Sequence, residues 1–151
     1  AKLVLAATHH RALCLNVGYT ARVGETHTYA TLAPQWVDYL GTHPHVLMHL
    51  GAHTHRMTVQ ARVPMGGHAF WELASPSLQD FPSQLRLVEV WDQDNGFLTF
   101  RTVAFDFATE GVPLAEEGRT IAVTDFTAAW SGDGRGTDAL QRNVELWIPQ
   151  P

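Results

Sequence analysis

The spacing of apolar residues divides the chain into two parts. Residues 2–8 (KLVLAAT) and 45–52 (HVLMHLGA) are continuous apolar runs, which are typical of strands buried on both faces. Between them, residues 31–44 (TLAPQWVDYLGTHP) carry an apolar side and then Gly41, which predicts a helix and its end. A strand, a helix and a second strand at this spacing predict a βαβ unit with parallel strands and a right-handed connection.

Beyond this unit, apolar and polar residues alternate, as in half-buried antiparallel strands. Four such segments are found, at residues 56–64, 68–76, 85–93 and 96–105. Asn95-Gly96 lies between the last two and predicts a hairpin turn. The remaining segments are predicted as a polar connector at 109–120, a glycine-rich loop at 131–138, and a short helix or extended tail at 138–151.

Composition narrows the classes of protein. The length of 151 residues suggests a single domain or part of one; we interpret residues 1–151 as one partial domain, with a βαβ segment at 1–63 and a β-rich segment at 64–151. The formal charge of −5 argues against a nucleic-acid partner, and no apolar run is long enough to predict a membrane span. One cysteine excludes an internal disulfide framework. The first residues resemble neither a signal peptide nor an initiator segment, so we expect an internal start; the cellular compartment stays open.

Histidines follow both apolar runs. His9 and His10 come after the first run, and His53 and His55 come after the second. The carboxyl ends of neighbouring parallel strands lie about 5 Å apart, so these imidazoles are expected to converge on one or two divalent ions. His53 and His55 have one residue between them, so in extended backbone their side chains would also point to the same face. We expect His49, inside the second run, to be an interior histidine rather than a ligand.

The order of these motifs resembles the C-terminal part of the calcineurin-like metallophosphoesterase superfamily. The resemblance starts with THHRA at 8–12 and GAHTH at 51–55, and continues through FWELASPSLQDFPSQLRLVEVWDQDNGFLTF at 70–100. DGRGTDALQRNVELWIPQP at 133–151 resembles the closing segment of one branch. The resemblance implies an α/β fold, the C-terminal half of a four-layer α/β/β/α sandwich, and divalent-metal-dependent hydrolysis of a phosphoester.

The resemblance also implies roles for individual residues. His9 and His53 would bind the second of two divalent metal ions (Fe, Mn or Zn), and His55 would bind the first. His10 would have a catalytic role in the outer shell, near the substrate phosphate. His27 and Ser75 are weaker candidates for substrate binding. The substrate remains open among monoesters, diesters and nucleotides.

Three motifs of the superfamily are missing from the sequence. No aspartate begins Asp-x-His or completes Gly-Asp-x-x-Asp, and no asparagine precedes a histidine. Ala52 also stands where the superfamily has glycine. Without carboxylates to offset two dications, we expect this chain alone to hold at most one ion, weakly, and to hydrolyse little or nothing. The missing ligands would come from an N-terminal half, present in the native product or supplied by a complementary chain.

Two other classes of protein remain as alternatives. A cupin-like metal-binding β-barrel would use His53 and His55 with Gln60 in the acidic position and Gly67 as the later glycine. A non-catalytic β-rich interaction domain would leave the histidines incidental. Two further expectations are that Glu72 either reaches the site or faces water from a strand, and that His68 belongs to a turn.

Overall fold

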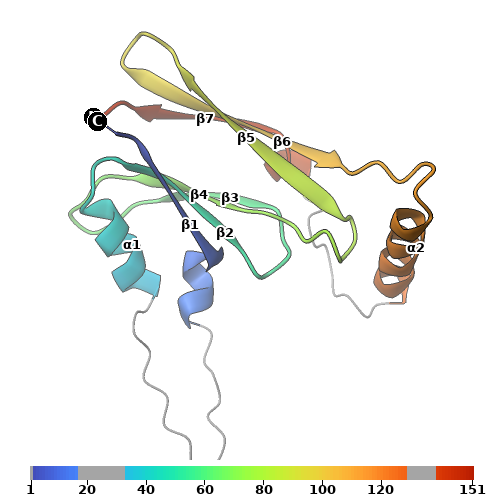
Figure 1. Ribbon diagram of the computed structural model, residues 1–151. Coiled ribbons are helices and arrows are strands. Elements are labelled where there is room, and N and C mark those ends of the chain that lie inside the picture. The colour runs from blue at the N-terminus through green and yellow to red at the C-terminus, as the bar shows by residue number, and fades with distance from the viewer. Residues whose placement is uncertain (1, 17–32, 129–138) are drawn as a thin grey trace, which may run out of the picture.

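A computed structural model describes residues 2–16, 33–128 and 139–151, which form a mixed α/β structure with two sheets and few helices (Figure 1). Sheet A contains β1 (Val4–His10), β2 (Val46–Ala52), β3 (Thr58–Arg62) and β4 (Phe70–Ala74), in the order β1-β2-β4-β3. Sheet B contains β5 (Gln84–Asp92), β6 (Phe97–Asp106) and β7 (Val144–Pro149), in the order β5-β6-β7.

The predicted βαβ unit is confirmed. β1 and β2 pair in parallel, and helix α1 (Ala33–Gly41) lies between them in the sequence. A short 3-10 helix, η1 (Ala12–Asn16), follows β1 and contacts α1. Helix α1 ends earlier than the predicted segment 31–44, and Gly41 is its last residue, as expected for a helix end. The carboxyl ends of β1 and β2 therefore lie at the same edge of sheet A.

The later strands are mainly antiparallel, as predicted, and β4 is the exception because it also has a parallel neighbour. Strand β4 lies between β2 and β3 and pairs with β2 in parallel, while β3 pairs with β4 antiparallel as predicted. A strand with neighbours on both sides, in a sheet covered on both faces, has most of its side chains buried. Four of the five residues of β4 are buried accordingly. Alternation of residue type indicates a strand, but it does not identify its partner.

Sheet B follows the sequence more closely. β5 and β6 form an antiparallel hairpin at the position that Asn95-Gly96 predicts. The positive φ angles lie at Asp94 (55°) and Gly96 (84°), so this is not the two-residue turn in which Asn95 and Gly96 would both have positive φ. The tail predicted as a short helix or an extended segment contains both: η2 (Ala139–Gln141) leads into β7, which pairs antiparallel with β6. The predicted glycine-rich loop at 131–138 lies outside the described residues.

The prediction of a polar connector at 109–120 is wrong, because residues from Pro113 onward belong to helix α2 (Pro113–Thr127). Pro113 occupies the first turn, where a missing N–H costs no hydrogen bond. Helix α2 has no continuous apolar stripe, so the spacing of residues in its sequence does not indicate a helix. Ala122 is its one buried residue. Near its end, the Phe126 ring stacks on Phe81 with 4.5 Å between ring centroids.

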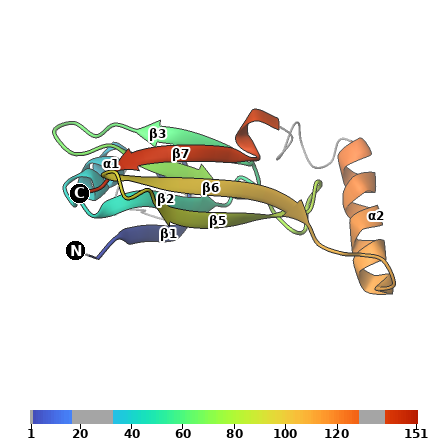
Figure 2. The same ribbon diagram turned by 90° about the horizontal axis from the view of Figure 1, so that it is seen from above.

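The main core lies between the two sheets, which face each other (Figures 1 and 2). Its buried residues are Leu47, Met48, Leu73, Leu98, Phe100, Leu146 and Ile148. A second cluster of Leu40, Val46 and Phe70 joins α1 to the opposite face of sheet A. No helix within residues 2–16, 33–128 and 139–151 is long and apolar enough to cross a membrane.

The outer face of sheet B is partly apolar. Four exposed residues lie there in two cross-strand pairs, Leu85 with Phe105 and Leu87 with Val103. Helix α2 lies beyond the end of this sheet (Figure 2). In the described part of the chain, no helix covers this face in the way that a four-layer sandwich would require.

Candidate metal centre

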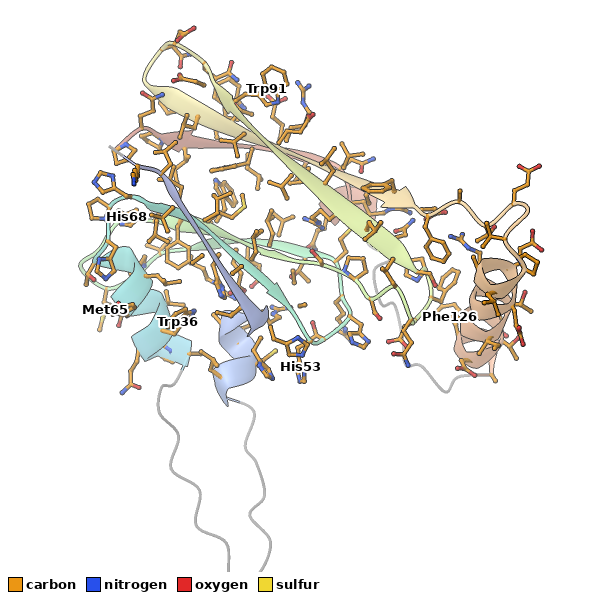
Figure 3. The ribbon with its side chains drawn as sticks, viewed as in Figure 1. Trp36, His53, Met65, His68, Trp91 and Phe126 are labelled. Atoms are coloured by element: carbon orange, nitrogen blue, oxygen red, sulfur yellow. The ribbon has the colours of Figure 1, made fainter. Side chains whose placement is uncertain are left out.

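Three histidines meet at the carboxyl edge of sheet A. His9 and His10 are the last residues of β1, and His53 directly follows β2. One ligand nitrogen from each residue lies within 4.8 Å of the other two. His53 is labelled in Figure 3, at the end of sheet A that also carries η1. The predicted convergence of His9 with His53 is confirmed, and His10 belongs to the same group.

The spacing of the ring nitrogens fits a shared cation. His9 Nε2 and His53 Nδ1 are 3.2 Å apart. Two nitrogens bound to one tetrahedral zinc ion at about 2.0–2.1 Å would be separated by about 3.3 Å. The His10 ring lies 4.1 Å from the His53 ring, centroid to centroid, and a ligand nitrogen of His10 lies within 4.8 Å of those of His9 and His53. The donor set is neutral imidazole, which suits Zn, Fe or Mn.

His53 and His55 do not form the extended His-x-His pair that the sequence predicts. Strand β2 ends at Ala52, and the backbone then turns, with φ 66° at His53 and φ 55° at His55. The Thr54 N–H donates to the Ala52 carbonyl within this turn, at 2.7 Å. Left-handed backbone at a non-glycine residue costs energy and is concentrated at functional sites. Because of the turn, the two imidazoles have different partners.

His55 pairs with Asp80 rather than with the other histidines. His55 Nδ1 and Asp80 Oδ2 are in hydrogen-bond contact, and both side chains are partly exposed. Asp80 comes from the β4–β5 loop, in which the Ser77 hydroxyl accepts the Gln79 N–H at 3.0 Å. Sequence reasoning missed Asp80, because its only signal is a single aspartate in a serine- and proline-containing loop. A carboxylate on the far nitrogen fixes the tautomer of a metal-binding histidine, so the pair leaves His55 Nε2 available.

The environment of His53 favours its neutral form. Desolvation by neighbouring groups lowers the pKa of His53, although the residue is exposed, and the nearby imidazoles of His10, His9 and His55 lower it further. A lowered pKa means that the ring is unprotonated over a wider pH range. Only the unprotonated ring has a lone pair for a metal ion.

A buried carboxylate, that of Glu72, lies beside the segment that follows His9 and His10. Glu72 is completely buried in β4, and its Oε2 accepts the backbone N–H of Ala12 at 2.8 Å and contacts His49 Nδ1 at 3.0 Å. Arg62 donates to the other oxygen. Burial alone would raise the pKa of Glu72, but the hydrogen bonds from His49, Arg62 and Ala12 outweigh it and lower the pKa to about 2. Both expectations for Glu72 are therefore wrong, since it neither joins the histidine group nor faces water.

This network continues to the strand that carries His9 and His10. His49 is completely buried, as predicted for an interior histidine. Its Nε2 lies 2.9 Å from the Thr8 hydroxyl, which donates to the His10 carbonyl at 2.5 Å. Through these contacts, Glu72 in β4 and His49 in β2 are linked to the end of β1.

The other candidate residues that the structure describes, Ser75 and His68, are not members of this group. His27 is outside the described residues. The Ser75 N–H donates to the Gly51 carbonyl, which places its backbone beside β2. His68 is half-buried before β4, and its two ring nitrogens lie 2.8 Å and 2.6 Å from the Gly41 and Val46 carbonyl oxygens.

The cupin alternative does not fit the architecture. A cupin is an all-β barrel, whereas β1, β2 and β4 form a parallel set in an open sheet. Gln60, the residue in the acidic position of that motif, accepts a hydrogen bond from Arg11 at 3.3 Å. A Cβ added to Gly67 would lie 2.6 Å from the Gly41 carbonyl oxygen, so this glycine serves a close packing contact.

No protein-family model matches the chain, and no curated protein matches it.

Proposed function

We propose that this chain contributes the imidazole side of a divalent-metal centre that hydrolyses phosphoesters. One observation carries the proposal: His9, His10 and His53 converge, with 3.2 Å between His9 Nε2 and His53 Nδ1. The group lies at the carboxyl edge of parallel strands, where the ligands of α/β proteins commonly bind. His55, held by Asp80, provides the imidazole for a second ion.

The complete centre requires carboxylates that this histidine group lacks. Within the described residues, the group contains histidines alone. Two dications about 3.5–4 Å apart repel strongly, and two-metal hydrolases offset this repulsion with bridging anionic ligands. Three neutral imidazoles are sufficient for one ion with an open coordination position. The chain alone would therefore bind one ion weakly and turn over little substrate.

Strand β1 offers the edge at which those carboxylates would be supplied. β1 is the outermost strand of sheet A and pairs only with β2 among the described strands. Its apolar residues Val4 and Leu5 are both 41% exposed, although its sequence is typical of a strand covered on both faces. It carries no proline or charged residue that would protect a free edge. A further parallel strand beside β1 would end about 5 Å from His9 and His10.

The experiment compares the chain alone with a longer product that includes the polypeptide encoded directly upstream. With Mn²⁺ or Zn²⁺ added, the longer product is expected to hydrolyse bis(4-nitrophenyl) phosphate, and the chain alone is expected to stay near the background rate. His53→Gly in the longer product should lower the rate by about 100-fold, because a ligand is lost while glycine retains the backbone conformation.

The control is His43→Ala, which removes an exposed histidine that packs on Tyr39 before β2. This variant should hydrolyse at the unaltered rate. Rapid hydrolysis by the chain alone would show that no further ligands are needed. A longer product that binds no metal would instead favour the non-catalytic interaction domain.

A further inference from the structure

A pocket lies at the opposite end of sheet A from the histidine group. Its cavity of about 380 Å³ opens between sheet A and β7. Leu47 near the start of β2 and Phe70 at the start of β4 contribute to one side, and Trp147 and Ile148 of β7 contribute to the other. In Figure 3, His68, which also lines the pocket, and His53 are at opposite ends of the sheet. At about 3.3 Å per residue along β2, the two sites are roughly 15–20 Å apart.

The lining indicates the chemistry of the ligand. It includes Phe70, two indole rings and three prolines, and no aspartate, glutamate, lysine or arginine. Flat aromatic and proline surfaces of this kind contact a flat apolar molecule over a large area. A cavity of this size is within the range that small ligands occupy in proteins.

The polar side chains of the pocket already have partners. The Trp71 indole N–H donates to the Trp147 carbonyl at 3.1 Å, and the Trp147 indole N–H donates to Glu145 at 3.1 Å. Gln150 donates through Nε2 to Asp92 at 2.8 Å. His68 is the one lining residue with an ionisable side chain, and both of its ring nitrogens are already engaged by backbone carbonyls. A charged group buried here would therefore lose its hydration without gaining a hydrogen-bonded counter-charge, which is unfavourable.

We propose that this pocket binds an uncharged, largely apolar small molecule that contains an aromatic ring. This site is independent of the proposed metal centre, because no residue of the pocket belongs to the histidine group. Its floor is preformed, since Leu47 and Phe70 are 1% and 2% exposed. Ligand binding therefore requires little reorganisation of the core.

The test uses two dyes with the same aromatic skeleton. N-phenyl-1-naphthylamine is uncharged, and 1-anilinonaphthalene-8-sulfonate adds one sulfonate. The uncharged dye is expected to bind once per chain with a dissociation constant of roughly 10–100 µM. The sulfonate should bind at least about tenfold more weakly. Fluorescence titration measures both constants.

Two variants locate the bound dye. Trp147→Ala removes an aromatic wall that is 48% exposed and so is not needed for the core, and Ala61→Phe fills the pocket from an exposed position in β3. Each should weaken binding of the uncharged dye by about tenfold or more. Circular dichroism and thermal unfolding check that both variants fold.

Two control variants complete the test. His53→Gly should leave the dye affinity unchanged, which separates this site from the metal centre. Leu87→Asn, on the outer face of sheet B, should also leave it unchanged. The proposal is overturned if the folded pocket variants bind the dye as the parent chain does, if Leu87→Asn removes binding, or if binding does not saturate.

Discussion

Replacing Glu72 by alanine is expected to lower the free energy of unfolding by about 3–5 kcal/mol, as is found when one partner of a buried charge pair is removed. The carboxylate is completely buried, and Arg62 and the Ala12 N–H would lose their acceptor. Glu72→Gln retains the shape of the side chain but not its charge, so it should also destabilise. Urea unfolding at neutral pH measures both effects.

The control for this prediction is an exposed ion pair. Glu145 and Arg101 lie 3.5 Å apart with side chains 44% and 54% exposed. Glu145→Ala should change the free energy of unfolding by less than about 1 kcal/mol. If Glu72→Ala were as mild as Glu145→Ala, the buried network would not be a source of stability.

The same carboxylate predicts how stability depends on pH. The pKa of Glu72 is lowered from 4.5 to about 2 in the folded protein, so its contribution is fully present above about pH 4.5. It is lost as the pH falls from about 4.5 towards 2. A shift of this size corresponds to about 3 kcal/mol, since one pKa unit is about 1.4 kcal/mol. The Glu72→Gln variant should not show this loss of stability when its free energy of unfolding is measured between about pH 4.5 and pH 2.

The second large effect is expected from Gly51→Ala in β2. A Cβ at this position would lie 2.7 Å from Arg11 Cα and 2.9 Å from Arg11 N, which are backbone atoms that cannot turn aside. We expect the free energy of unfolding to fall by about 2–3 kcal/mol, in the range of other overpacked sites. Because Arg11 directly follows His10, metal affinity should fall as well. Urea unfolding and a metal titration measure the two effects.

Gly118→Ala is the matched control for this change. Gly118 lies inside α2, and an added Cβ there would meet no atom within 4 Å. Alanine should raise the free energy of unfolding by about 0.5–1 kcal/mol, because it restricts the unfolded chain and favours the helix. An equal loss of stability in both variants would contradict the close approach of Gly51 to Arg11.

Much of the framework of the candidate site follows from the sequence. The two continuous apolar runs predict parallel strands, and the histidines after them therefore lie at one edge. His9 and His53 meet as this argument requires. His49 is also a histidine, but it lies inside the second apolar run rather than after it. It is accordingly buried, and it pairs with Glu72.

Other features depend on contacts that a linear pattern does not contain. Strand β4 looks like any alternating strand, and its place beside β2 is decided by packing. Helix α2 has no apolar stripe, so periodicity gives no signal for it. The left-handed turn at His53 and His55 ends the extended backbone on which the His-x-His argument rested. Asp80 is 25 residues from His55, and nothing in its surroundings in the sequence connects the two.

We propose that His9, His10 and His53 share one divalent cation. The most direct measurement is an isothermal titration of Zn²⁺ into the folded chain, His53→Gly and His43→Ala. We expect one ion for each chain, a loss of affinity of at least about tenfold in His53→Gly with stability retained, and no change in His43→Ala. Equal zinc affinity in the chain and in His53→Gly, or no zinc binding by the chain, would contradict it.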